Sequence, residues 1–144
     1  MNAKARAKIN AYSGYHINPI NKLTHYIGIP LILFSTIGLF RYLGWHHYNL
    51  GTLSILLVTF YYWRTMDLKI ATLFFCIAGL FYYTSLFLSW HVILGIFVAS
   101  WILQFVGHQI YEKKQPAFLE NMEHLLIGPA WLIHRLTSGN RLMG

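Results

Sequence analysis

Four apolar segments, almost free of charged residues, constrain this chain more than any other feature of its sequence. A helix needs about 20 apolar residues to cross the hydrocarbon core of a bilayer, and fewer where interfacial residues complete it. Only 10% of the residues are charged, whereas soluble domains use about 25% to cover a water-facing surface. The pattern therefore predicts that residues 1–144 form a single integral membrane domain. The expected spans are residues 23–40, 50–63, 70–88 and 91–110, followed by an interfacial tail over 116–144.

The positive charges are divided unevenly between the two sides that these spans define. Of the 11 Lys and Arg residues, all but Arg41 precede the first span, separate the second from the third, or follow the fourth. Cytoplasmic segments of membrane proteins carry an excess of Lys and Arg, so both termini are predicted to be cytoplasmic. We interpret the net charge of +7 as this orientation signal and not as a nucleic-acid-binding surface. The residues on the predicted cytoplasmic side are Lys4, Arg6, Lys8, Lys22, Arg64, Lys69, Lys113, Lys114, Arg135 and Arg141.

The expected fold is all-α: a four-helix membrane bundle with an amphipathic C-terminal helix. Pro116 can occupy the first position of that helix, and the pair Gly128-Pro129 is expected to end it before a second short interfacial piece. The lone cysteine, Cys76, excludes an intramolecular disulfide. Apolar residues recur at helical spacing in the tail at Phe118, Leu119, Met122, Leu125 and Leu126.

Two histidines lie where the chain enters the first span. His16 and His25 are nine residues apart, so on one straight helix they would point to opposite faces. Pro19 disfavours one continuous helix, because the residue before a proline is restricted to extended conformations. The chain can therefore turn and direct both imidazoles to one place. The alternative is that both histidines are interfacial and bond to lipid headgroups.

At the cytoplasmic end of the fourth span, Gln104, His108 and Glu112 recur every four residues and form one stripe of a helix. A His and a Glu at this spacing can bind the same metal, or the Glu can accept a hydrogen bond from the second ring nitrogen of a metal-bound His. Gly107 would allow another backbone or a ligand to approach closely. The alternative is a Glu–His pair at the surface of a helix end.

The predicted topology places His16, His25, His108 and Glu112 at the same membrane face. Three imidazoles and one carboxylate could bind zinc, manganese or iron(II), and nitrogen and oxygen ligands alone do not choose between these metals. The remaining histidines form two groups: one is interpreted as interfacial on the opposite face, and the other lies in the cytoplasmic tail, where its members could join the site but are more often solvated, so they are second-rank candidates. The first group comprises His46, His47 and His91, and the second comprises His124 and His134.

These two segments resemble the Mpo-like family of membrane 2-hydroxy fatty acid dioxygenases. The first family motif, YHxxxxNxxxHxxGxP, is matched by Tyr15, His16, Asn21, His25, Gly28 and Pro30. The second, WxxQFxGHxxxExxxPA, is matched by Trp101, Gln104, Phe105, Gly107, His108, Glu112, Pro116 and Ala117. A trailing GP pair is matched by Gly128 and Pro129.

The resemblance implies an enzyme of fatty acid α-oxidation, an Fe(2+)-dependent dioxygenase that uses O2 to shorten a 2-hydroxy fatty acid by one carbon. It implies that His16, His25 and His108 bind the iron, with Glu112 as a fourth ligand or as a partner of a ligand. The remaining expected site residues are Gln104 and Asn21, which could bond the substrate or the imidazoles, and Lys22, Lys113 and Lys114, which could attract the carboxylate.

Two other functions are compatible with the same residues. One is a non-catalytic lipid-binding membrane protein whose metal site only holds the ends of the chain together. The other is a haem-binding electron carrier, which is disfavoured because the second and third spans contain no histidine to hold a macrocycle inside the bundle. We expect the protein in a bacterial inner membrane, or in the endoplasmic reticulum if it is eukaryotic.

Overall fold

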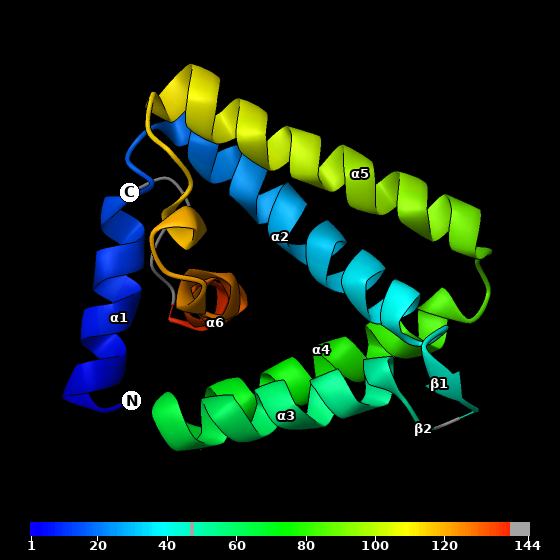
Figure 1. Ribbon diagram of the computed structural model, residues 1–144. Coiled ribbons are helices and arrows are strands. Elements are labelled where there is room, and N and C mark those ends of the chain that lie inside the picture. The colour runs from blue at the N-terminus through cyan, green and yellow to red at the C-terminus, as the bar shows by residue number, and fades with distance from the viewer. Residues whose placement is uncertain (47, 139–144) are drawn as a thin grey trace.

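The computed structural model describes residues 1–46 and 48–138, and its regular structure is helical apart from one short hairpin (Figure 1). His47 and Arg141, which the sequence analysis assigned to the outer face and to the tail, lie outside the described residues. The α-helices are α1 (Ala3–Gly14), α2 (Pro19–Phe40), α3 (Leu50–Thr65), α4 (Leu68–Ser85), α5 (Trp90–Val106) and α6 (Glu123–Thr137). A π-helix, η1 (Gly107–Glu112), extends α5, and a 3-10 turn, η2 (Ala117–Leu119), precedes α6. In the hairpin, β1 (Gly44–Trp45) pairs antiparallel with β2 (Tyr48–Asn49).

The helices form two antiparallel pairs that meet at one end of the molecule and diverge toward the other (Figure 1). One pair is α2 with α5, and the other is α3 with α4. The pairs meet near the β1–β2 hairpin. At the opposite end, α6 fills the space between them and α1 packs against α6. The start of α2, the end of α5 and the turn between α3 and α4 therefore all lie at the end that contains α1 and α6.

Three helical segments are long and apolar enough to cross a membrane: Pro19–Phe40, Leu68–Ser85 and Trp90–Glu112. They correspond to the first, third and fourth predicted spans, so the all-helical membrane fold is confirmed at this level. The second predicted span lies within α3, which has only 16 residues. The four-helix membrane bundle and the cytoplasmic position of the termini stay predictions.

The break between the first two helices follows the prediction from Pro19. Asn18 caps α2, because its extended backbone ends the preceding turn and its side chain accepts hydrogen bonds from the amides of Ile20 and Asn21. Pro19 then occupies the first position of the helix, where no amide donor is needed. The chain turns between Tyr15 and Asn18, and this turn carries His16.

The prediction that Gly128-Pro129 ends the tail helix is wrong, because α6 runs through both residues. A proline inside a helix removes one backbone hydrogen bond and is tolerated where neighbouring groups compensate. Tyr62 of α3 holds this turn of α6 in place, since its hydroxyl donates to the Leu126 carbonyl, next to the Leu125 carbonyl that Pro129 leaves without its helical donor. The tail is therefore one helix with a buried face, and not two interfacial pieces.

Large apolar side chains cover the outside of the helix pairs. On α3, for example, Leu56, Leu57 and Phe60 are each more than half exposed. A soluble protein would bury such residues, whereas a membrane protein presents them to lipid. The buried core lies instead around α6 and the fully buried ring of Trp131, and it takes in residues of α1, α2, α3 and α4.

Candidate functional site

Three histidines from three separate segments converge at the wide end of the fold. His16 lies in the turn before α2, His25 lies on α2, and His108 lies in the π-helix η1. Their ring centroids are 4.2 Å (His16–His25), 4.7 Å (His25–His108) and 5.2 Å (His16–His108) apart, and all three side chains are buried. The predicted convergence of these residues, which we call the histidine trio, is confirmed.

Backbone carbonyls fix the orientation of two members of the trio. Nδ1 of His16 lies 2.7 Å from the Tyr12 carbonyl oxygen, and Nδ1 of His25 lies 2.8 Å from the Asn21 carbonyl oxygen. A carbonyl can only accept, so each Nδ1 carries the proton and each Nε2 carries a lone pair. Nε2 of His25 lies 3.1 Å from Nε2 of His108. The free lone pairs therefore face the interior of the trio.

The trio fits a metal ion. One ring nitrogen from each histidine lies within 4.8 Å of the others, and the buried Nε2 of His16 has no hydrogen-bond partner among the described residues. A buried polar atom without a partner is costly, and a cation at the centre would remove that cost. Imidazole ligands whose second nitrogen bonds a carbonyl are the usual arrangement in metal sites. The trio could hold iron or zinc, since imidazole suits both.

Burial also keeps His16 in the form that a metal needs. Removal of the ring from water lowers the pKa of His16 from 6.5 to about 4, because the charged form loses its solvation. A metal binds only the neutral imidazole. His16 is therefore available as a ligand at neutral pH.

The close contact between α2 and η1 sets the position of His108. A Cβ atom at Gly107 would lie 2.2 Å from Thr24 Oγ1 and 2.6 Å from Asn21 Oδ1, so only glycine fits there. The close approach expected at Gly107 is present, but the groups that approach are the side chains of Thr24 and Asn21, and not a backbone or a ligand. The wider turn of the π-helix changes the direction of the side chains after Val106, and such turns are frequent at functional sites. No sequence pattern indicated it.

Glu112 lies beside the trio but is occupied by other partners. Its carboxylate accepts hydrogen bonds from the amides of Ile17 and Asn18 and from Nδ2 of Asn21, each at 3.0 Å. These bonds tie the end of η1 to the turn that carries His16. Glu112 does not belong to the group of ligand atoms that the trio forms, and its role as a fourth ligand stays a prediction.

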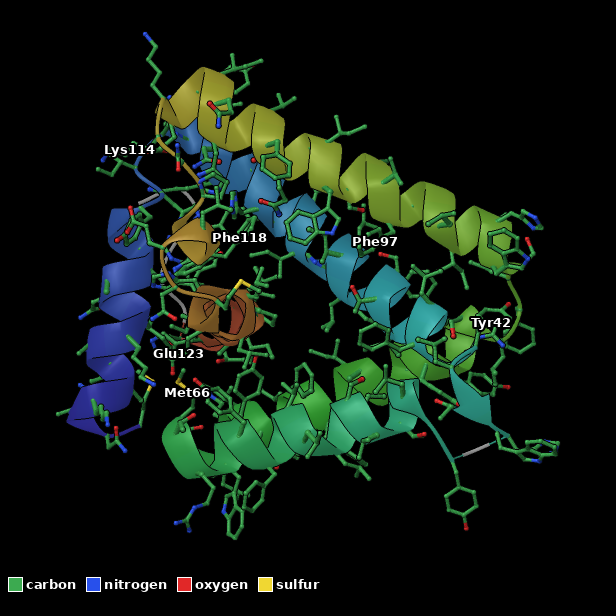
Figure 2. The ribbon with its side chains drawn as sticks, viewed as in Figure 1. Tyr42, Met66, Phe97, Lys114, Phe118 and Glu123 are labelled. Atoms are coloured by element: carbon green, nitrogen blue, oxygen red, sulfur yellow. The ribbon has the colours of Figure 1, made fainter. Side chains whose placement is uncertain are left out.

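Beside the trio begins a cavity of about 450 Å³ that runs along α2 as far as Leu39 and Phe40. Its walls come from α2, α3, α5 and α6, and they are almost entirely apolar. Phe97 of α5 and Phe118 of η2, which Figure 2 labels, belong to this lining. The cavity thus joins a polar end, where the trio could hold a metal, to a long apolar interior.

A family model described as "Mpo1-like: 2-hydroxy-palmitic acid dioxygenase Mpo1-like" matches residues 3–139. The chain belongs to the Mpo1-like family. The 2-hydroxy-palmitic acid dioxygenase MPO1 of Saccharomyces cerevisiae is 32% identical over 133 residues, which cover 89% of this chain and 76% of the yeast protein. No solved structure matches the chain. The resemblance that the two histidine motifs indicated is thereby confirmed.

The other motif residues of this Mpo1-like chain divide into two groups. Gln104 is buried, lines the cavity, and has no hydrogen-bond partner for Nε2 within residues 1–46 and 48–138. Asn21 is fully buried but does not line the cavity. Asn21 affects the site only through its neighbours: its backbone carbonyl orients His25, and its side-chain amide donates to the Glu112 carboxylate.

The lysines that were expected to attract substrate lie away from the cavity. Lys22 lines a separate pocket of about 300 Å³ with Tyr26 and Leu132, and Lys113 is exposed at the end of η1. Neither contributes to the cavity lining. Their role in substrate binding stays a prediction.

One of the two second-rank candidates from the tail, His124, lies at the site. It is part of the cavity wall, half-buried, with Nδ1 2.9 Å from the Ala117 carbonyl oxygen. It stands between Glu123 and Leu125 without a periodic signal that could have identified it. His134, the other tail histidine, bonds to Ser138 and does not line the cavity.

Proposed function

We propose that this protein is an iron(II)-dependent dioxygenase that cleaves 2-hydroxy fatty acids with O2 and yields a fatty acid one carbon shorter. The observation that carries this proposal is the position of the histidine trio at the polar end of an apolar cavity. The yeast relative is named for 2-hydroxy-palmitic acid, a molecule with an apolar chain and a small polar headgroup. The cavity complements the chain, and the trio complements the headgroup.

The proposed reaction balances without any further reductant. The bond between C1 and C2 breaks, C2 becomes the new carboxyl carbon, and C1 leaves as carbon dioxide. C2 loses three electrons and C1 loses one, which together are the four electrons that one O2 accepts. The remaining oxygen atom leaves as water. The substrate and O2 are therefore sufficient reactants.

The contribution of the chain itself is to hold and shield the reacting groups. Iron(II) bound by the trio would activate O2 and bind the hydroxyl and carboxylate of the substrate. The carbonyls of Tyr12 and Asn21 keep His16 and His25 in the required tautomer. The cavity excludes water from the acyl chain, and the unpartnered amide of Gln104 can donate to an oxygen of the headgroup.

Metal content and turnover test this proposal together. We expect the purified protein to bind iron and, in air, to convert 2-hydroxyhexadecanoic acid to pentadecanoic acid. His16→Ala, His25→Ala and His108→Ala should each lose bound iron and turnover, because two imidazoles rarely retain a metal that three hold. His91→Ala is the matched control, since His91 is exposed at the start of α5. His108→Gln, which preserves volume, covers the case in which the alanine variant does not fold.

Removal of the metal provides the second test. A chelator should abolish turnover. Reloading with iron(II) under anaerobic conditions, followed by assay in air, should restore it, whereas reloading with zinc should not, because zinc has no redox chemistry. A protein that binds iron but yields no product would instead be a lipid-binding membrane protein with a structural metal site. Full activity in any alanine variant of the trio would contradict the ligand assignment.

A further inference from the structure

Even if one carboxylate oxygen of the proposed substrate binds a metal in the trio, the other oxygen enters a cavity that offers few groups able to receive it. A buried carboxylate needs a cation or hydrogen-bond donors. No Lys or Arg lines the cavity within the described part of the chain, and the side chains there that can carry a positive charge are all histidines. His16, His25 and His108 face one another and fit a metal. The fourth lining histidine, His124, belongs to no metal group.

The local contacts of His124 leave one ring nitrogen for a ligand. Nδ1 lies 2.9 Å from the Ala117 carbonyl oxygen and therefore donates to it. The structure provides no hydrogen-bond partner for Nε2 over the described ranges. The two nearby acids are already engaged, since Glu123 binds Lys8 and Tyr61, and Glu120 accepts a hydrogen bond from Tyr15.

The ring of His124 stands next to the trio with one aromatic residue between them. Its centroid is 6.1 Å from that of Tyr12, and the Tyr12 ring stacks on His16 at 4.4 Å. The ring of Tyr15 also packs on His124, with 5.5 Å between the ring centroids. These contacts fix the plane of the imidazole at the polar end of the cavity.

We propose that His124 binds the carboxylate of the 2-hydroxy fatty acid through Nε2 and so orients the headgroup against the trio. This inference rests on the proposed function, since it assumes an acid as the ligand. In the imidazolium form both ring nitrogens donate, Nδ1 to the Ala117 carbonyl oxygen and Nε2 to an oxygen of the ligand. His124 is thus a specificity residue that selects an acid over a neutral lipid.

Binding of two matched ligands under anaerobic conditions tests this role without turnover. The iron-loaded protein is titrated with 2-hydroxyhexadecanoate and with 1,2-hexadecanediol, which keeps the chain and the hydroxyl but lacks the carboxylate. In His124→Asn the amide can still donate to Ala117, but no group remains at the position of Nε2. We expect this variant to bind the acid about tenfold or more weakly, the size of a lost charge-assisted hydrogen bond, and to bind the diol normally. His124→Gln, which places a donor near Nε2, should recover part of the loss.

The controls separate this inference from the proposed function. His134→Asn makes the same change on α6 away from the cavity and should alter neither affinity. Bound iron should be unchanged in His124→Asn, and a loss of iron would show instead that His124 supports the metal. If His124→Asn weakened the binding of the acid and of the diol equally, or weakened the binding of neither, the carboxylate role would be overturned. If the protein gives no product with O2 but His124→Asn still selectively weakens the binding of the acid, the proposed function fails while this inference holds.

Discussion

At the scale of single residues, the trio depends on a carboxylate that does not belong to it. Glu112 accepts three hydrogen bonds that fasten η1 to the turn carrying His16. In Glu112→Gln one oxygen becomes a donor, so at least one of the three donors loses its acceptor. We expect the free energy of unfolding to fall by about 2 kcal/mol, measured by thermal unfolding in detergent, and the affinity for iron to fall without being abolished.

The control for this variant is Glu120→Gln, because Glu120 is exposed and accepts a single bond from Tyr15. Its unfolding temperature should stay close to that of the unmodified protein. If Glu112→Gln binds no iron even at saturating concentrations, Glu112 is a metal ligand and not an anchor.

The buried state of His16 also predicts how the metal-free protein responds to acid. Burial lowers the pKa of His16 from 6.5 to about 4, so as the pH falls the unfolded chain takes up this proton before the folded one does. The His16 contribution to stability is then complete above the unfolded pKa and is lost progressively down to the folded pKa, by on the order of 3 kcal/mol. Unfolding temperatures across this range measure the loss. His16→Phe, which keeps the stack on Tyr12, should show a shallower decline, and an equal decline would assign the effect to other groups.

At the scale of elements, the contact between α2 and η1 controls the position of His108. In Gly107→Ala the new methyl group would overlap the side chains of Thr24 and Asn21, which are both buried on α2. Overpacking of this kind costs about 1–3 kcal/mol and should move His108 away from His25. We expect lower stability together with weaker iron binding. Gly95→Ala is the control, because a Cβ there meets nothing within 4 Å and alanine favours a helix over glycine.

The same elements show how far a sequence of this kind predicts its structure. The break at Pro19 and the convergence of His16, His25 and His108 followed from local rules and from charge distribution. The π-helix at His108 and the continuity of α6 through Pro129 did not, because both depend on partners far away in the sequence. The Tyr62 hydroxyl donates to the Leu126 carbonyl of α6, near Pro129 and 64 residues away in the sequence. The spacing of residues within 116–144 cannot predict that contact. For the same reason the sequence left His124 as a second-rank candidate and could not place it in the cavity wall.

At the scale of the whole molecule, the trio constrains the number of membrane crossings. His25 near the start of α2 touches His108 in η1, which extends α5, so the chain between them must return to the face from which it left. The paired helices α3 and α4 run antiparallel between the two ends (Figure 1). If α4 crosses the bilayer, α3 must cross it as well, although its 16 residues span only about 24 Å of a hydrocarbon core about 30 Å thick.

Site-directed labelling tests whether α3 and α4 both cross the bilayer. In a Cys76→Ala background, single cysteines at Lys4, Lys69 and His46, all exposed, are treated with a membrane-impermeant maleimide in sealed vesicles. Lys4 and Lys69 should react from the same side and His46 from the opposite side, because α3 returns the chain to the end that holds the trio. A short α3 would then require local thinning of the bilayer beside it. Labelling of Lys69 together with His46 would mean that α3 does not cross, and the trio could then assemble only if α4 also stayed on one side.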